Sequence, residues 1–177
     1  MEAGAIDQAR VAANELVARV RDLSLDLRPS MLDDLGLLPA LLWHFERYAA
    51  RSGIQVRFSH QGLEGRRFGS SVETAAYRIA QEALNNVVKH AKAEQITLSL
   101  TVQPVPDLTG EERYKIDLMI RDDGVGYLLR EGQSIHLGLG IMTERAEAIQ
   151  AGLSMESQPG SGTQINLTWP AVGWSEK

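Results

Sequence analysis

The chain has 177 residues, enough for one domain with a hydrophobic core and a shorter additional segment, and its hydrophobic fraction of 44% is ordinary for a globular protein. Its net charge of −5 and its scattered Lys and Arg side chains argue against a nucleic-acid-binding protein, which is usually basic. The sequence has no cysteine, which excludes a disulfide framework and a zinc–thiolate site, and no stretch of about 20 apolar residues that would span a membrane.

The first predicted element is a helix over residues 2–28. Its apolar side chains recur at alternating spacings of three and four residues, which is typical of the seam of a helical bundle. The seam consists of Ile6, Ala9, Ala13, Leu16, Val20, Leu23 and Leu27. An amphipathic helix that packs on its own domain is the alternative, but such a helix usually has a wider apolar stripe. Pro29 ends the helix because proline lacks the backbone donor.

The rest of the chain alternates predicted helices and strands. After a connector over residues 31–36, helices are predicted over residues 37–51, 70–92 and 141–151. Ser70 and Glu73 have the spacing of a capping box, and Gly152 is the expected C-cap of the last helix. Strands are predicted over residues 54–59, 96–102, 114–121, 153–157 and 164–169, with loops over 62–69, 104–112 and 124–138. This order indicates an α/β (α+β) two-layer sandwich, in which helices cover one face of a mixed, largely antiparallel sheet.

A polar line runs along the helix predicted over residues 70–92. Glu82, Asn86 and Lys89 follow one another at helical spacing, and His90 lies beside them. The amide oxygen of Asn86 is a suitable ligand for Mg²⁺, which usually takes only one or two ligands from protein, and Lys89 can offset phosphate charge. A solvated helix face with a Glu82–Lys89 ion pair is the structural alternative, and this helix alone does not decide between them.

Three glycine-rich turns follow this helix in the chain, over residues 122–126, 138–141 and 160–163. Glycine lets the backbone turn sharply and approach a ligand closely, and a turn that leads into a helix N-terminus favours phosphate. A β-turn, a flexible loop and a hairpin turn are the respective structural alternatives. The ordered set of four segments is stronger evidence for a nucleotide site than any one of them.

These four segments resemble the ATP-binding catalytic domain of bacterial sensor histidine kinases, within the superfamily that also contains gyrase and heat-shock-chaperone ATPases. Residues 81–91 (QEALNNVVKHA) are similar to the N box of the subfamily that pairs with response regulators of the nitrate-regulator type. Residues 122–126 (DDGVG), 138–141 (GLGI) and 160–163 (GSGT) resemble the glycine boxes of these kinases. Residues 27–37 resemble the junction between their dimerisation helices and catalytic domain.

The resemblance implies a role for the residues of these motifs. Asp122 would hold the adenine amino group, Asn86 would ligate Mg²⁺, and Thr163 would support the adenine end. Glu82 and Lys89 would act in catalysis, and Lys89 and His90 would contact phosphates. The residues implied in binding ATP are Asn86, Lys89, His90, Asp122, Gly124, Gly126, Gly138, Leu139, Gly140, Ile141, Gly162 and Thr163.

The same resemblance predicts a part in a phosphorelay that uses ATP and Mg²⁺. Residues 1–30 would be the second helix of a dimerisation bundle and residues 31–177 the ATP-binding catalytic domain, so the parent protein is expected to be a homodimer. None of the four histidines, His44, His60, His90 and His136, is followed by the acidic residue typical of an acceptor. The acceptor-histidine helix is therefore expected outside this chain, and a response regulator would receive the phosphoryl group from it.

We expect a cytoplasmic domain without contact to nucleic acid or membrane, and leave open whether the parent protein is anchored in a membrane. Two other functions stay open at this point. One is a nucleotide-gated binding module without transfer activity. The other is an anti-sigma-type serine kinase of the same superfamily, which usually lacks a helix like that over residues 2–28.

Overall fold

The computed structural model describes residues 30–63, 65–105, 113–127, 137–172 and 175–176. The helix predicted over residues 2–28, with its apolar seam, lies outside the described residues. The helices are α2 (Ser30–Leu35), α3 (Leu37–Ser52), α4 (Ser70–Asn86), the π-helical turn η1 (Val87–Ala91) and α5 (Leu137–Ala148). The strands are β1 (Gln55–Gln61), β2 (Arg66–Arg67), β3 (Gln95–Val105), β4 (Arg113–Asp122), β5 (Gly152–Ser157), β6 (Thr163–Val172) and β7 (Ser175–Glu176).

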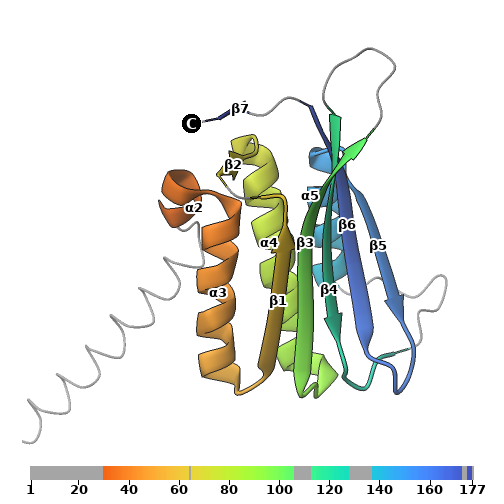
Figure 1. Ribbon diagram of the computed structural model, residues 1–177. Helices are drawn as coiled ribbons and strands as arrows, with labels where there is room; N and C mark the ends of the chain where they lie inside the picture. The colour runs from red at the N-terminus through yellow and green to blue at the C-terminus, as the bar shows by residue number, and fades with distance from the viewer. Residues whose placement is uncertain (1–29, 64, 106–112, 128–136, 173–174, 177) are drawn as a thin grey trace, which may run out of the picture.

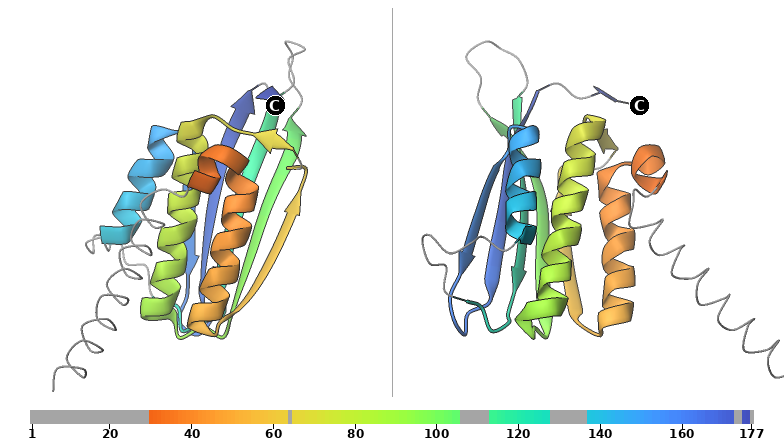
Figure 2. Two further views of the ribbon diagram at one scale, coloured as in Figure 1. Left: turned by 90° about the vertical axis from the view of Figure 1, so that its left-hand side faces the viewer. Right: turned by 180° about the vertical axis from the view of Figure 1, so that it is seen from behind.

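Five strands form the main sheet in the order β1-β3-β4-β6-β5. β1 and β3 are parallel, and every other pair in this sheet is antiparallel. Helices α3, α4 and α5 lie side by side on one face of the sheet, as Figures 1 and 2 show. The prediction of a two-layer sandwich with a mixed, largely antiparallel sheet is therefore confirmed. No helix among the described residues is long and apolar enough to cross a membrane.

The core lies between α4 and the central strands. Every second residue of β3 from Ile96 to Val102 is buried, as expected for a strand with one face toward helices. The buried side chains that meet here include Ala76, Ile79, Ala80, Ala83 and Leu84 of α4 and Ile96, Leu98 and Leu100 of β3. The alanines let α4 lie close to the sheet. This helix also contacts α3, where the Tyr48 hydroxyl donates to the Leu84 carbonyl at 3.2 Å and burial raises the pKa of Tyr48 to about 12.

Two details at the N-terminal side differ from the sequence prediction. Residues 31–36 were predicted as a connector, but most of them form α2. The capping box is also wrong, because Gly69 is the N-cap of α4 and no side chain caps it. The Glu73 carboxylate instead accepts hydrogen bonds from Arg67 and from the Phe68 backbone N–H. The Glu73 side chain is thus engaged with Arg67 and with the residue before the N-cap, and not with the N-cap backbone N–H that a capping box would use.

The last helix begins and ends earlier than predicted. It was expected over residues 141–151 with Gly152 as its C-cap, but α5 runs from Leu137 to Ala148 and Gly152 begins β5. Gln150 takes the left-handed conformation with φ 55°, and the Ala151 N–H donates to the Ala146 carbonyl at 2.9 Å. The chain thus reverses at Gln150, before it reaches Gly152. A C-cap prediction that looks for glycine does not find this position.

Candidate functional site

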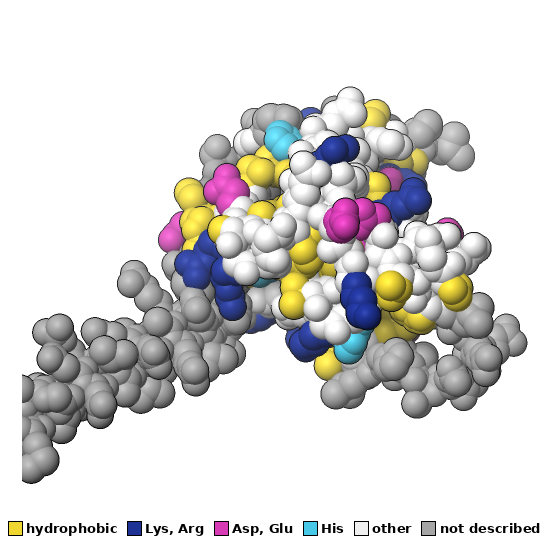
Figure 3. Space-filling view, turned by 90° about the horizontal axis from the view of Figure 1, so that it is seen from below, with side chains coloured by type: hydrophobic (Ala, Val, Ile, Leu, Met, Phe, Trp, Pro, Cys, Tyr) yellow, Lys and Arg dark blue, Asp and Glu magenta, His cyan; other side chains and the backbone are white. Residues whose placement is uncertain are grey.

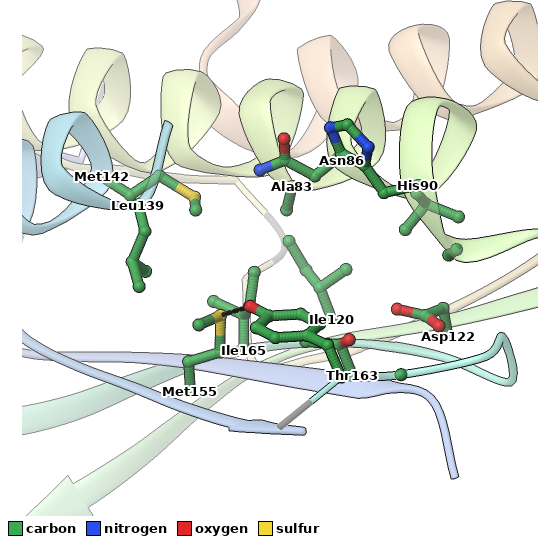
Figure 4. A pocket seen from close by; sticks show the side chains of 14 residues that line it. Ala83, Asn86, His90, Ile120, Asp122, Leu139, Met142, Met155, Thr163 and Ile165 are labelled. Carbon is green, nitrogen blue, oxygen red and sulfur yellow. Dashed lines mark hydrogen bonds between the residues drawn. The ribbon is translucent and has the colours of Figure 1, made fainter. Parts of the chain in front are cut away.

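A cavity of about 240 Å³ opens between the helix layer and the sheet (Figure 4). Its helix side comes from α4, η1 and α5, and its sheet side from β4, β5, β6 and the loop after β4. The lining residues are Ala83, Asn86, Val87, His90, Ala91, Ile120, Asp122, Gly126, Tyr127, Leu139, Met142, Met155, Thr163 and Ile165. Most of the wall is apolar, with Asn86 and His90 on the helix side and Asp122 and Thr163 on the sheet side.

The π-helical turn η1 decides which polar side chains face this cavity. In a π-helix the hydrogen bonds join residues i and i+5, so each turn holds more residues than in an α-helix. One turn beyond Asn86 the chain therefore brings His90 and Ala91 to the cavity. The predicted line of Glu82, Asn86 and Lys89 assumed regular helical spacing and is broken after Asn86.

Lys89 lines a second hollow, between α3 and the α4–η1 helix, of about 270 Å³. Its neighbours there include Trp43, Arg47, Arg51 and Asn85. Figure 3 views the end of the molecule at which α3 and η1 finish, and Lys and Arg side chains stand at the surface there. The structure does not bring Lys89 together with Asn86, His90 and Asp122, so the predicted phosphate contact of Lys89 gains no support from this geometry.

Asp122 is the buried polar group of the cavity, with 5% of its surface exposed. Its Oδ1 atom accepts a hydrogen bond from the Gly124 backbone N–H at 2.9 Å. Burial raises the pKa of the Asp122 carboxyl group, and the hydrogen bonds from the Gly124 and Thr163 backbones partly oppose that rise in pKa. A buried carboxylate in a largely apolar wall can accept a hydrogen bond from a ligand with little competition from water.

Three glycines allow neighbouring backbone segments to approach one another closely around Asp122. An added Cβ at Gly124 would overlap the Ala91 carbonyl oxygen, one at Gly126 the Gln158 carbonyl oxygen, and one at Gly162 the Asp122 carbonyl oxygen. Hydrogen bonds hold the same segments, from the Val125 N–H to the Ala91 carbonyl and from the Gly160 N–H to the Val125 carbonyl, each 2.7 Å long. The end of η1, the loop 122–126 and the turn 158–162 are therefore joined by direct backbone contact.

The segment 138–141 differs from its prediction as a turn before a helix, because it lies within the first turns of α5. An added Cβ at Gly138 would overlap Glu82 Oε1, so α5 passes close to the Glu82 side chain of α4 at this residue. Leu139 lines the cavity, whereas Gly140 and Ile141 are not among its lining residues. Glu82 itself lies beside Gly138 and Asn86, at the contact between the two helices.

Sequence reasoning predicted Leu139 but missed the rest of the apolar and aromatic wall. Tyr127 lines the cavity, its backbone N–H donates to Ser157 Oγ at 3.0 Å, and its hydroxyl donates to Met155 Sδ at 3.1 Å (dashed in Figure 4). Burial, with a smaller effect of Asp122, raises the pKa of Tyr127. The aromatic residue directly after a Gly-x-Gly turn was a signal for Tyr127, but Met142 and Met155 carry none in the sequence.

The donor set fits Mg²⁺ only in company with phosphates. Among the described residues, no group of three or more His, Asp or Glu side chains could hold a metal ion. Asn86 offers one amide oxygen at the cavity, with Glu82 close by. Mg²⁺ bound to a nucleotide takes most of its ligands from phosphates and water, so one or two protein oxygens suffice.

Comparison with known proteins gives consistent results. The family model "Histidine kinase-, DNA gyrase B-, and HSP90-like ATPase" matches residues 71–173. The chain is 34% identical over 165 residues to the signal transduction histidine-protein kinase/phosphatase DegS of Brevibacillus brevis, covering 93% of this chain and 40% of that protein. It is 35% identical over 158 residues to the oxygen sensor histidine kinase NreB of Staphylococcus carnosus (strain TM300), covering 89% of this chain and 43% of that protein.

The chain thus spans about two fifths of the length of these curated relatives. Among solved structures, full-length ShkA in complex with AMPPNP superposes with a TM-score of 0.54 at 17% identity, covering 80% of this chain and 31% of that chain. At this identity the likeness establishes the shared fold.

The backbone contact at Asp122 can be tested with two matched glycines. Gly160 and Gly162 have φ values of 79° and 75°, but a Cβ at Gly160 meets no atom within 4 Å. We expect Gly160→Ala to lower the free energy of unfolding by about 1–2 kcal/mol, the cost of a left-handed non-glycine residue. Gly162→Ala should cost about 1–3 kcal/mol more, because Asp122 must move. Urea unfolding measures both, and equal losses would contradict the contact.

Proposed function

The chain belongs to the histidine kinase-, DNA gyrase B- and HSP90-like ATPase family, and we propose that it is the catalytic domain of a two-component sensor histidine kinase. It binds Mg-ATP and transfers the γ-phosphoryl group to a histidine outside these 177 residues, from which an aspartate of a response regulator takes it. The observation that carries the proposal is the cavity that sets the buried Asp122 opposite Asn86 and His90. Because its substrate is ATP, we place the domain in the cytoplasm.

The sheet side of the cavity suits adenine. A purine is flat and largely apolar, and its amino group is a hydrogen-bond donor. Ile120, Met155 and Ile165 offer an apolar surface beside the Asp122 acceptor, with the Thr163 hydroxyl group close by. The presence of AMPPNP in the full-length ShkA structure, which has the same fold, supports an adenine nucleotide as the ligand.

The helix side of the cavity suits phosphates. The amide oxygen of Asn86 would hold Mg²⁺, which offsets phosphate charge, and His90 lies at the exposed mouth where the phosphate chain would leave. Transfer breaks the bond between the γ-phosphorus and the β–γ bridging oxygen of ATP, which leaves with ADP as a terminal oxygen of the β-phosphate, and forms a bond from phosphorus to the acceptor nitrogen. Such reactions rely on positioning and on charge neutralisation. Glu82, beside Asn86, would help to position the acceptor, and Lys89 would serve the phosphates only by swinging out of the second hollow.

Substitution of Asp122 tests the adenine end. In Asp122→Asn the amide oxygen is expected to keep the Gly124 N–H as its donor, so the amide NH2 group takes the place of the second carboxylate oxygen and a donor faces the adenine amino group. We expect ADP affinity to fall by about ten- to a hundredfold, measured by calorimetry. Asp123→Asn is the matched control. Asp123 Oδ1 accepts hydrogen bonds from the Glu94 and Gln95 backbones at 2.9 and 3.0 Å, which an amide oxygen can also do. Unchanged affinity in Asp122→Asn would remove Asp122 from the adenine site.

Substitution of Asn86 tests the metal ligand. Asn86→Ala should weaken Mg²⁺-dependent ATP binding more than metal-free ADP binding, because the lost oxygen contacts the metal and not the base. Asn85→Ala is the control, since Asn85 is exposed and lines the second hollow. Calorimetry with and without Mg²⁺ separates the two effects. An equal loss in both measurements would mean that Asn86 has only a structural role.

Phosphotransfer tests the reaction itself. The chain alone should take up no acid-labile label from γ-labelled ATP, because its histidines lack the acceptor context. Addition of the acceptor-histidine segment of the parent protein should give a labelled segment. Binding of ATP without any transfer would instead favour a nucleotide-gated binding module, and label stable to acid on serine would favour the serine-kinase alternative.

A further inference from the structure

Arg67 joins three parts of the fold through one side chain. Its Nε and Nη2 atoms each donate to the Glu73 carboxylate at 3.0 Å, which makes a bidentate ion pair. Nη2 also donates to the backbone carbonyls of Leu32 at 3.3 Å and Asp33 at 3.1 Å. Glu73 is buried, and its Oε1 atom accepts a further bond from the Phe68 N–H at 3.0 Å. We call this set of contacts the Arg67 clasp.

The clasp satisfies the end of a helix that is too short to be stable alone. α2 has six residues, and the last carbonyls of any helix lack partners within it. Arg67 donates to two of these carbonyls, and the Gly36 N–H donates to the Leu32 carbonyl at 3.1 Å. Gly36 has φ 88°, and an added Cβ there would come within 2.7 Å of Arg67 Cδ and Nε. The chain therefore turns from α2 to α3 directly against the Arg67 side chain.

The other partner of the clasp lies on the helix that forms the nucleotide site. Glu73 is in the first turn of α4, and Asn86 is the last residue of the same helix. α4 has 17 residues, which corresponds to a rod of about 25 Å. The left view of Figure 2 shows α2 beside the N-terminal end of α4. The contacts that fix α2 to Glu73 therefore also fix the direction of α2 relative to Asn86.

We propose that Arg67 is a positioning residue that locks α2 to α4 and so sets how the chain enters the catalytic domain at Ser30. This inference rests on the proposed function, in which an acceptor histidine outside the chain must meet the γ-phosphoryl group. The dimerisation helix predicted over residues 2–28 joins the described domain through α2. A fixed α2 limits the orientations in which the cavity is presented to that helix, and effective transfer needs such restriction.

The side chain has to be arginine for this purpose. Its planar fork presents several donors at fixed angles, so it can bind a carboxylate with two of them and still reach the carbonyls of α2. Lysine carries the same charge on a single nitrogen. Arg67→Lys therefore keeps a cation for Glu73 while it loses the bridge to α2, which separates the positioning role from the stability of the buried pair.

Because the sequence has no cysteine, spin labels can be attached at two introduced cysteines without removing any native one. Spin labels at Leu35→Cys, an exposed residue at the end of α2, and Glu147→Cys, an exposed residue of α5, report how α2 sits on the domain. We expect one narrow distance distribution for the parent sequence, and a distribution at least about twice as wide for Arg67→Lys. Arg66→Lys is the control, because Arg66 is also in β2 but lies over the Tyr114 ring at 5.1 Å.

Two further measurements exclude a merely structural effect. ADP affinity of Arg67→Lys should stay within about twofold of the parent chain, whereas phosphotransfer in the full-length parent protein should slow by about tenfold. An unchanged distance distribution in folded Arg67→Lys and Arg67→Gln would overturn the inference. If the unsubstituted full-length protein transfers no phosphoryl group, the proposed function fails, and the label distances still decide whether Arg67 locks α2.

Discussion

The cavity depends on three backbone segments that approach one another more closely than side chains permit. The end of η1, the loop after β4 and the turn before β6 contact each other at Gly124, Gly126 and Gly162. Two hydrogen bonds of 2.7 Å link these segments. Because backbone lies against backbone, the Asp122 carboxylate is buried and its Oδ1 atom is fixed by the Gly124 N–H. A methyl group at any of these glycines would move the segment that carries the acceptor.

The burial of Asp122 costs free energy, which its raised pKa reflects. A buried carboxylate with a raised pKa is common at ligand-binding sites, because the carboxylate gains a strong hydrogen-bond partner only when the ligand binds. The wall around Asp122 is apolar. Ile120, Met155 and Ile165 form an apolar surface beside the acceptor, and the thioether of Met155 is a flexible and polarizable group of the kind that fills irregular gaps.

The opposite wall is set by a single change of helical period. In a regular α-helix both Lys89 and His90 are neighbours of Asn86 on one face, but with the π-helical turn His90 lines the cavity and Lys89 lines the neighbouring hollow. π-helical turns are uncommon and often occur at functional sites. The same helix begins at the Arg67 clasp, so α4 carries both the contact with α2 at Glu73 and the Asn86 side chain at the cavity.

The sequence by itself determined the layers and the ligand class of the site. Strands with one buried face and helices with one apolar face have periods that are visible locally. Gly124, Gly126 and Gly162 of the predicted glycine turns mark places where a Cβ would overlap backbone atoms. It did not determine the capping of α4, the start of α5 or the direction of Lys89. Glu73 meets Arg67 rather than a cap because the folded chain brings a guanidinium to it. Gly138 lies inside α5, where Glu82 of α4 lies against it. Contacts between segments distant in the sequence decide these features, and no local pattern contains them.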